Sequence, residues 1–266
     1  MKKITAYICM ALFIFGFQAQ AIEFKNNKEI EKIFISEKAK GTFVLYDVEN
    51  NTFTGYNKVR SEKLYSPAST FKIMNSLIGL ETGAVKSVDE VFYKYDGSKV
   101  FLDSWKKDAS LRYAISVSQV PAYKELARRI GLEEMQENII KLNYGNKNIG
   151  KKVDTFWLDG ALKITAIQQT EILAQLAQKK LPYSKENQEA VSDITKLDSG
   201  KNWVLHGKTG WATANLNPSI GWFVGWVEQD GKIYSFAINM DIKDSSELPK
   251  REEIAKQSLR VLGLLK

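Results

Sequence analysis

The sequence predicts a mixed α/β protein in which an antiparallel sheet is formed by both ends of the chain and covered by helices. Three observations predict this class. Apolar and β-branched residues typical of strands occur near the start, at 42–56. Helical spacing of apolar residues then runs through the middle, from about 69 to 197, and strand-like segments return between 203 and 240. The middle of the chain is therefore expected to form an inserted all-helical lobe.

The individual elements are predicted in chain order from these patterns. Two strands at 42–46 and 53–56 flank an Asn-containing turn and predict a hairpin. Helical periodicity predicts helices at 69–83, 121–130, 133–142, 165–178 and 185–197. Antiparallel strands are predicted at 203–206, 221–228 and 232–240, followed by an amphipathic helix at about 248–265.

Nothing in the sequence divides these elements into separate domains. The chain has no fixed-period repeat, low-complexity tract or Pro/Gly/Ser-rich linker. We therefore expect residues 22–266 to fold as a single domain. Its sheet lobe is expected to comprise 22–65 and 198–266, and its mainly helical lobe 66–197.

Residues 1–21 have the features of a secretory signal peptide. Lys2 and Lys3 precede an apolar run at 4–17, and the small residues Ala-Gln-Ala follow at 19–21. We expect cleavage after Ala21 and a periplasmic or secreted mature protein without membrane attachment. An uncleaved anchor is the alternative. No later segment reaches the roughly 20 apolar residues that a spanning helix needs.

Charge and rare residues exclude several kinds of site. The formal net charge is +7, but the basic residues occur as scattered pairs, which favours a solvated surface over nucleic-acid binding. The single cysteine, Cys9, lies within the predicted signal peptide, which removes disulfides and thiol catalysis from the mature chain. The single histidine, His206, excludes a three-histidine zinc site. A Ser-His-Asp triad would have to use His206, for which a structural or surface role is the simpler interpretation.

A Ser-x-x-Lys pattern occurs twice, and its surroundings separate the two copies. Ser69 and Lys72 lie on one face at the predicted start of a helix, among apolar neighbours that lower the pKa of a lysine. Free N–H groups at the helix start would also face an oxyanion formed by attack of Ser69. The copy at 104–107 is surrounded by aspartates and lysines, which predict an exposed, protonated lysine. A helix cap with a solvent-directed lysine is the alternative for the first copy.

Lys208, Thr209 and Gly210 form a second candidate site. A Walker A phosphate loop would require glycine where this chain has Asn202, so this motif does not predict nucleotide binding. The remaining functional interpretation is a strand end where the lysine and the hydroxyl hold an anionic substrate. The glycine would let that substrate lie close to the backbone. A plain strand end with a glycine turn is the alternative.

Three further segments have simple structural explanations when each is taken alone. Residues 118–120 (Ser-Gln-Val), just before a proline, fit a helix cap, and residues 144–146 (Tyr-Gly-Asn) fit a turn. Residues 157–160 (Trp-Leu-Asp-Gly) fit core packing. Only their combination with the two lysine motifs favours a function.

Taken in order, these motifs resemble the motif set of the class D serine β-lactamases, the oxacillinases. The motifs lie at 69–72, 118–120, 144–146, 157–160 and 208–210, and the resemblance extends over essentially all of the chain after residue 21. The related class A enzymes have Ser-Asp-Asn where this chain has Ser-Gln-Val, which disfavours class A. The resemblance implies the β-lactamase-like fold of penicillin-recognising serine enzymes.

The resemblance also implies a role for each catalytic residue. Ser69 would be the acylated nucleophile, and Lys72, N-carboxylated by carbon dioxide to N6-carboxylysine, would be the general base. Trp157 would donate its indole N–H to the carbamate. Ser118 would pass a proton to the departing lactam nitrogen with the help of Lys208. The residue chemistry agrees, because only a neutral amine adds to carbon dioxide and apolar surroundings favour that form.

The remaining site residues are implied to bind the substrate. The resemblance places Lys208, Thr209 and Arg251 at the substrate carboxylate, and the backbone N–H groups of Ser69 and Trp211 in the oxyanion hole. The substrate-binding set is completed by Val120, Leu158 and Gly210.

The expected function is hydrolysis of the β-lactam amide of penicillin-type antibiotics, which confers resistance. The expected partner is the small-molecule β-lactam, without nucleic acid, and the only co-reactant is carbon dioxide or bicarbonate, without a metal. A monomer and a homodimer both stay open. A penicillin-binding transpeptidase and a β-lactam sensor that stays acylated are the alternatives. Variation of the loop at 212–219 within the family leaves carbapenem hydrolysis open.

Overall fold

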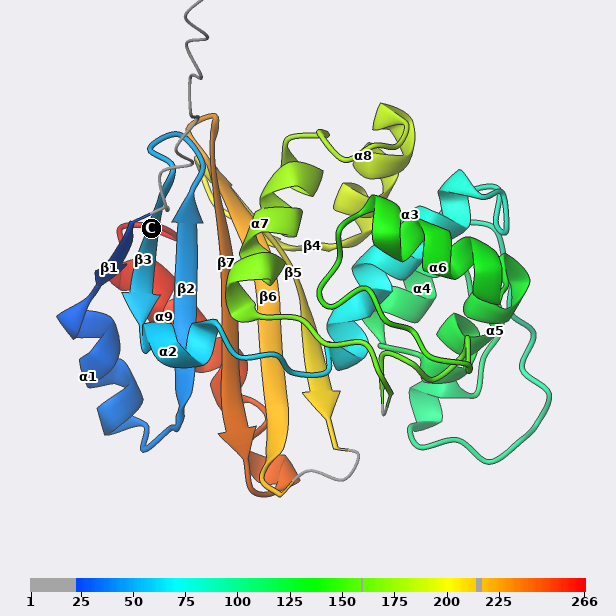
Figure 1. Ribbon diagram of the computed structural model, residues 1–266, viewed down its shortest axis with the longest axis horizontal. Coiled ribbons are helices and arrows are strands. Elements are labelled where there is room, and N and C mark those ends of the chain that lie inside the picture. Colours follow the sequence, from blue (N-terminus) through cyan, green and yellow to red (C-terminus); the bar gives the residue numbers. More distant parts are fainter. Residues whose placement is uncertain (1–22, 159, 214–216) are drawn as a thin grey trace, which may run out of the picture.

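A single sheet of seven strands organises the protein. The computed structural model describes residues 23–158, 160–213 and 217–266, so the predicted signal peptide and Asp159 of the fourth motif lie outside the described residues. The strand order is β1-β3-β2-β7-β6-β5-β4 (Figure 1). The strands are β1 (Phe24–Asn26), β2 (Gly41–Asp47), β3 (Thr52–Tyr56), β4 (Lys196–Ser199), β5 (Trp203–Ala212), β6 (Ser219–Gln229) and β7 (Lys232–Ile242).

Helices flank the sheet and form the inserted lobe. The α-helices of the described residues are α1 (Lys28–Ser36), α2 (Lys58–Ser61), α3 (Lys72–Glu81), α4 (Leu111–Ser116), α5 (Val120–Ile130), α6 (Leu132–Lys141), α7 (Ala166–Ala177), α8 (Lys185–Ile194) and α9 (Lys250–Val261). Short 3-10 helices are η1 (Ala68–Phe71), η2 (Asp103–Trp105) and η3 (Ser245–Glu247).

The two ends of the chain meet in the sheet, as the sequence predicts. β2 pairs antiparallel with β7, with Phe43 opposite Ile238, so the N-terminal hairpin continues directly into the C-terminal strands. The short strand β1 is absent from the prediction and runs parallel to β3, with Phe24 opposite Phe53. The sheet is therefore antiparallel except at this edge.

Two predicted boundaries are wrong because pairing in the sheet decides them. The helix predicted to reach residue 197 ends at Ile194, and β4 begins at Lys196, opposite His206 of β5. β5 itself continues to Ala212, since β6 pairs with it along its whole length. The Lys-Thr-Gly motif at 208–210 therefore lies inside a strand and not at a strand end.

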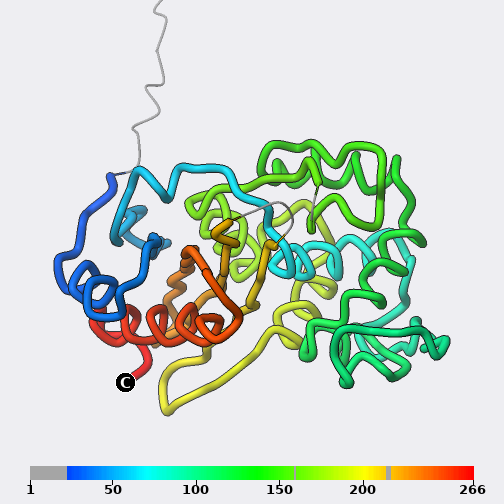
Figure 2. The backbone as a smooth tube through the Cα atoms, turned by 90° about the horizontal axis from the view of Figure 1, so that it is seen from below, coloured from blue at the N-terminus to red at the C-terminus, as the bar shows by residue number. Residues whose placement is uncertain are grey.

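Helices cover both faces of the sheet. α1 and α9 lie on one face (Figure 2), where Phe34, Phe236 and Ile254 belong to one apolar cluster. α7 lies on the opposite face and contacts β7 and β2. Strands β2, β6 and β7 are consequently buried on both sides, which accounts for their nearly unbroken apolar sequences.

Local side-chain hydrogen bonds fix the starts of these covering helices. Asn27 precedes α1, and its side chain accepts hydrogen bonds from the N–H groups of Glu29 and Ile30. Thr165 and Gln168 form a reciprocal capping box at the start of α7. Each device satisfies N–H groups that have no partner within the helix, and together they set where the helices begin on the sheet.

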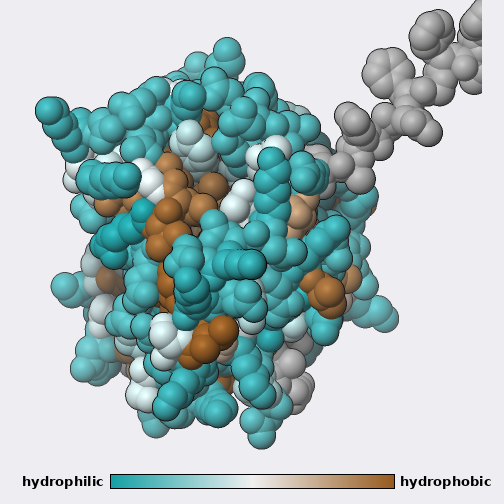
Figure 3. Space-filling view, turned by 90° about the vertical axis from the view of Figure 1, so that its left-hand side faces the viewer, coloured by the Kyte–Doolittle hydropathy of each residue, from teal (hydrophilic) through white to brown (hydrophobic). Residues whose placement is uncertain are grey.

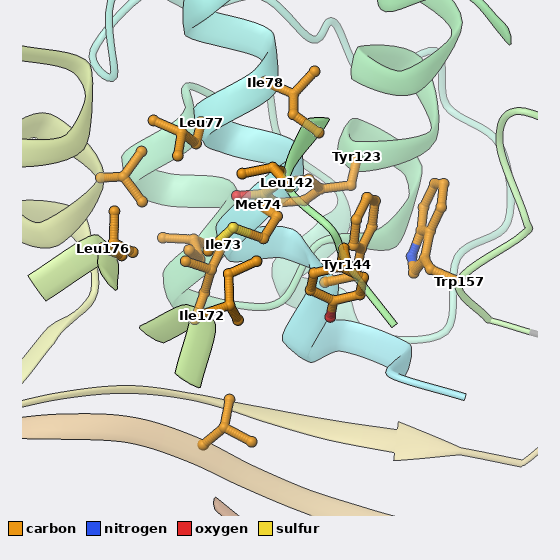
Figure 4. Close-up of a cluster of buried hydrophobic side chains, with 14 of the residues drawn as sticks. Ile73, Met74, Leu77, Ile78, Tyr123, Leu142, Tyr144, Trp157, Ile172 and Leu176 are labelled. Atoms are coloured by element: carbon orange, nitrogen blue, oxygen red, sulfur yellow. The ribbon is translucent and has the colours of Figure 1, made fainter. Parts of the chain in front are cut away.

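The helical lobe packs around α3. Apolar side chains from α3, α5, α7 and the connecting loops meet in one cluster, which includes Met74, Leu77, Tyr123 and Ile172 (Figure 4). Burying a side chain of this size stabilises a fold by about 1.5–3 kcal/mol. Every residue from Lys72 to Leu80 is buried, and α3 contacts α4, α5 and α8, so it forms the centre of this lobe.

The outer face at the β1 edge lies away from the helical lobe. Figure 3 shows this face covered mainly by hydrophilic side chains, with a narrow apolar strip. The dispersed charges of the sequence account for this surface. Across the described ranges, no helix has the length and apolar character needed to span a bilayer.

Candidate active site

Ser69 and Lys72 lie where the turn η1 passes into α3. The Nζ atom of Lys72 is 2.6 Å from the Oγ atom of Ser69. Lys72 has no exposed surface. Burial in the first place, and the charge of Lys208 in the second, hold the pKa of Lys72 well below its ordinary value. The neutral amine that results can take up a proton from the serine hydroxyl, which is the arrangement of an activated nucleophile.

The second Ser-x-x-Lys copy lies in different surroundings. Lys106 and Lys107 are exposed, and Lys106 forms a 2.7 Å ion pair with Asp103. Hydrogen bonding to that carboxylate raises the pKa of Lys106. Lys107, the lysine of this motif copy, is exposed as predicted, whereas Lys72 is buried.

Trp157 is joined to the chain segment just before Ser69. Its carbonyl oxygen accepts hydrogen bonds from Ala68 N (2.8 Å) and Ser66 Oγ (2.8 Å). Its ring lies 5.7 Å from that of Phe71, between centroids. The indole Nε1 is buried and has no hydrogen-bond partner within the described part of the chain. A buried donor without an acceptor is costly, so this atom marks a place for an added acceptor beside η1.

The strand β5 approaches the Ser69 turn closely at Gly210. A Cβ atom on Gly210 would lie 3.0 Å from Thr70 Cγ2 and 3.1 Å from Pro67 O, tighter than ordinary contacts. β4 pairs with β5 only as far as His206. The part of β5 that follows therefore lies against η1, and glycine is required there because the two backbones nearly touch.

The same strand carries the cationic side of the site. Lys208 is 7% exposed, and burial together with the charge of Arg251 lowers its pKa to about 7. Its Nζ donates to the carbonyl and the hydroxyl oxygens of Thr209 at 3.2 and 3.3 Å. Arg251, on α9, donates from Nη1 to Gly210 O at 2.8 Å, which joins α9 to β5. Cations gathered beside the serine suit an anionic substrate.

Trp211 follows Gly210 on the same strand. It lies opposite Gly221 in β6, and its indole Nε1 donates to Ser219 Oγ at 2.9 Å. This bond fixes the Trp211 side chain toward β6. The position of Gly210 against η1 brings the neighbouring main chain of Trp211 to the same side of the site as Ser69.

Ser118 and Val120 lie at the start of α5. The helix-cap interpretation is confirmed in position, since Gln119 is the N-cap of α5 and Pro121 lies in its first turn, but the Gln119 side chain makes no capping bond. Ser118 has φ +55°, a left-handed conformation that is unusual for serine. The ring centroid of Tyr123 lies 5.3 Å from Lys72 Nζ, which brings this end of α5 against the start of α3. Val120 lines a cleft of about 360 Å³.

Residues 144–146 support the loop that carries Trp157 and Leu158. Gly145 has φ +54°, and a Cβ atom there would collide with Lys163 O. Asn146 donates from Nδ2 to Ala161 O (2.7 Å) and accepts from Lys163 N (3.0 Å). Leu158 is half-buried against the core, and its carbonyl accepts from Ser66 Oγ at 3.3 Å. These contacts hold the loop beside the serine turn.

His206 is a structural residue in the sheet. Its ring stacks on Trp226 with 4.4 Å between centroids, and its Nδ1 lies 2.9 Å from Ser192 O. Burial lowers its pKa. The stacked ring is fully engaged with its neighbours, which agrees with the simpler interpretation of the single histidine. In the portion that the structure describes, no cluster of three or more His, Cys, Asp or Glu side chains could hold a metal ion.

Two residues that lie near Ser69 and Lys72 are not indicated by any sequence motif. Tyr123 packs its ring against Lys72, and Ser66 ties the Trp157 loop to η1. The spacing of Tyr123 on the apolar face of α5 predicts burial but not proximity to Lys72. The bond made by Ser66 joins positions far apart in the sequence, so no local pattern could indicate it.

Comparisons with known proteins agree with this geometry. Residues 35–260 match the family model of the penicillin-binding protein transpeptidase domain. The chain is similar to β-lactamase OXA-5 of Pseudomonas aeruginosa, with 40% identity over 100% of this chain and 99% of the relative. It is also 38% identical to β-lactamase OXA-48 of Klebsiella pneumoniae, over 93% of this chain and 92% of the relative.

A solved structure is similar as well. The crystal structure of FUS-1 (OXA-85), a class D β-lactamase from Fusobacterium nucleatum subsp. polymorphum, has a TM-score of 0.89 and 57% identity. The similarity covers 91% of this chain and 100% of that chain. Full-length relatives, the shared fold and the buried serine–lysine pair lead to one conclusion: the chain belongs to the class D β-lactamases, within the penicillin-binding transpeptidase family.

Proposed function

We propose that the protein hydrolyses the β-lactam amide of penicillin-type antibiotics through an acyl-enzyme on Ser69 and so confers resistance. The observation that carries this proposal is the 2.6 Å separation between Ser69 Oγ and the Nζ of the fully buried Lys72. In the first half-reaction, Ser69 Oγ forms a bond to the lactam carbonyl carbon and transfers its proton to the base at Lys72. The C–N bond then breaks, and Ser118 delivers a proton to the departing nitrogen.

The second half-reaction releases the product and restores the serine. Water loses a proton to the base at Lys72 and attacks the ester carbonyl, and Ser69 leaves with a proton. The base must therefore accept a proton twice in each turnover. This requirement separates a hydrolase from a protein that only becomes acylated.

We infer that Lys72 is N-carboxylated when the enzyme turns over. The chemistry of the site supports this inference, since a low pKa leaves the Lys72 amine neutral and able to add carbon dioxide. The unpartnered Nε1 of Trp157 supplies a donor for the resulting anion. A carbamate would provide an anionic base beside Ser69. Trp157 would hold it, and Lys208 would balance its charge.

The substrate carboxylate is proposed to bind between β5 and α9. Lys208, Thr209 and Arg251 offer the donors for it, and the close contact of Gly210 with η1 brings these residues near Ser69. The oxyanion is proposed to accept hydrogen bonds from the N–H groups of Ser69, in the first turn of η1, and Trp211. Val120 and Leu158 would contact the apolar parts of the substrate.

A burst assay tests the hydrolase. The purified protein, without residues 1–21, is mixed with a chromogenic cephalosporin in bicarbonate buffer beside a Ser69→Ala variant. We expect sustained turnover that the variant loses. A single stoichiometric burst that stalls would contradict the proposal and indicate a penicillin-binding protein or a sensor.

A separate measurement tests the carbamate. Protein equilibrated with ¹³C-bicarbonate should show a carbamate ¹³C resonance that Lys72→Ala lacks. Trp157→Phe removes only the indole donor, and we expect it to weaken the resonance and slow deacylation. Trp203→Phe, which loses an indole bond to Lys266 O on a remote part of the sheet, is the control. Full carboxylation and normal deacylation in Trp157→Phe would remove Trp157 from the mechanism.

Export and assembly are proposed on the sequence alone. We infer that residues 1–21 direct export and are removed after Ala21, leaving residues 22–266 as one domain in the periplasm or medium. N-terminal sequencing of the exported protein tests this cleavage. Sedimentation of the purified protein distinguishes a monomer from a homodimer.

A further inference from the structure

Gln119 follows Ser118, the proposed proton donor. Its side chain binds the segment at 105–107, where Trp105 lines the same cleft as Val120. The Gln119 side chain is fully buried, and its Nε2 donates to Trp105 O and to Lys107 O, each at 2.9 Å. In the opposite direction, Trp105 Nε1 donates to Val117 O at 3.0 Å. These bonds tie the segment at 105–107 to both sides of Ser118.

The bonds of Gln119 are not needed to start the helix that follows. Gln119 occupies the N-cap position of α5, yet its side chain makes no capping bond there. Its Oε1 is buried without a partner in the described part of the chain. Both amide hydrogens are thus used on another segment, while an acceptor is left unsatisfied at a cost. The polar side chain of Gln119 therefore binds the 105–107 segment and does not cap α5.

Ser118 lies just past the C-cap of α4. Its φ of +55° is the left-handed conformation that a helix end with two closing main-chain bonds imposes on this position. The main chain on either side is held, since Ser118 N donates to Ile115 O (3.2 Å) and Gln119 N donates to Ala114 O (2.8 Å). The Gln119 side chain adds the link that keeps this turn against the 105–107 segment.

We propose that Gln119 is a positioning residue that holds the Ser118 turn against the 105–107 segment, and so aims the Ser118 hydroxyl at the departing nitrogen. The proposal rests on the function proposed above, because it assigns Ser118 to proton delivery. Without the two amide bonds, the turn keeps its main-chain bonds to α4 but loses its attachment to the 105–107 segment, and the hydroxyl shifts away from the reacting groups. Gln119 then acts on the reaction only through Ser118.

A double-mutant cycle tests this dependence. Gln119→Met keeps the length of the side chain and removes both donors. With the chromogenic cephalosporin, we expect about a tenfold loss of kcat/KM in the wild-type background, since positioned acid catalysis is worth at least this much. In a Ser118→Ala background, the same substitution should cause no further loss, because the hydroxyl that it misplaces is already gone.

Gln188→Met is the matched control. Gln188 is also fully buried, and its Nε2 donates to Leu181 O (3.2 Å) and Tyr183 O (3.0 Å), away from the proposed site. We expect it to lower the melting temperature as Gln119→Met does, but to leave kcat/KM unchanged. If Gln119→Met does not fold, Gln119→Asn, which is too short to reach both carbonyls, enters the same cycle.

The outcomes separate this inference from the proposed function. An unchanged kcat/KM in the Gln119 variant, or an equal loss in both Ser118 backgrounds, would overturn the positioning role while the hydrolase assignment stands. Failure of the wild-type protein to turn over would instead overturn the proposed function.

Discussion

At the scale of single residues, the chemistry of this site depends on two buried lysines, Lys72 and Lys208. Lys72 lies against Ser69 Oγ, and Lys208 lies near enough for its charge to lower the pKa of Lys72. Burial disfavours the charged form of each, and it lowers the pKa of Lys208 to about 7. The charge of Lys208 is therefore expected to depend on pH within the working range of the enzyme.

The pH profile of kcat/KM should show this titration. Lys208 is cationic below its pKa of about 7 and can attract the substrate carboxylate, and it loses that charge as the pH rises. We expect kcat/KM of the wild-type enzyme to fall on the alkaline side with an apparent pKa above 7, because kcat/KM reports the free enzyme and the carbamate proposed on Lys72 would raise the pKa of Lys208. Lys208→Arg, whose guanidinium stays charged, should move this limb to higher pH.

The exposed Lys232 provides the control for this profile. It pairs with Glu49 at 2.6 Å, so Lys232→Arg should leave the pH dependence unchanged. An alkaline limb at the same pH in Lys208→Arg as in the wild type would show that another group titrates there.

At the scale of elements, the site depends on how closely β5 approaches η1. The sequence places Lys208 and Ser69 in separate motifs, and Gly210 permits the contact that unites them. Thr70 strengthens the same junction, since its hydroxyl donates to Pro67 O (2.7 Å) and accepts from Gln169 Nε2 (2.8 Å) on α7. The turn is thus held by the sheet on one side and by α7 on the other.

Gly210→Ala tests the importance of this approach. The added Cβ would meet Thr70 Cγ2 at 3.0 Å and Pro67 O at 3.1 Å, so β5 and η1 must separate by a few tenths of an ångström. We expect kcat/KM to fall about tenfold or more, because small misplacements of reacting groups cost rate steeply. The free energy of unfolding should fall by about 1–3 kcal/mol.

Gly79→Ala is the control that distinguishes a loss of stability from a displacement of the reacting groups. In Gly79→Ala on α3, the new Cβ would lie 2.8 Å from a Leu126 side-chain atom, away from the reacting groups. We expect this variant to lose stability and keep its kcat/KM. Equal kinetic effects in the two variants would contradict the special role of the β5–η1 contact.

The sequence predicts the elements of this fold better than their ends. Long periodic segments such as 121–130 and 232–240 are confirmed as α5 and β7. The spacing of apolar residues within each segment is enough to predict them. The strand at Lys196 and the extension of β5 beyond His206 depend on pairing partners distant in the sequence, which no local pattern encodes. Residue types likewise indicate Ser69 and Lys72, but not the left-handed turn at Ser118.

At the scale of the whole molecule, both ends of the chain form one sheet, and the site beside it contains two buried lysines. α9 reaches β5 through Arg251 and Gly210, so the last helix completes the pocket that the middle of the chain begins. Lys208 and Lys72 are buried there without a carboxylate partner in the described hydrogen bonds and ion pairs. Packing in the large apolar clusters offsets the free-energy cost of burying these lysines. The functional residues therefore lower the net stability of the protein.

Replacing Lys208 should stabilise the protein in a pH-dependent way. The pKa of Lys208 is about 7 in the folded protein and about 10.4 in an unfolded chain, so between these values the unfolded state binds more protons. The free energy of unfolding of the wild type must then rise with pH in this window, and the cost of burying Lys208 is complete only below about pH 7. Lys208→Met lacks this cost and should be more stable by about 2–4 kcal/mol at pH 7, although inactive.

Urea unfolding measured from pH 6 to pH 10 checks both the size and the sign of this effect. The advantage of Lys208→Met over the wild type should be constant below pH 7 and shrink as the pH rises toward 10, because the folded lysine is then neutral and the unfolded lysine begins to lose its proton. Lys243→Met, at an exposed position, should show little difference at any pH. An advantage that stays constant over the range would mean that Lys208 keeps its charge in the folded protein, and the alkaline limb of kcat/KM would then need another origin.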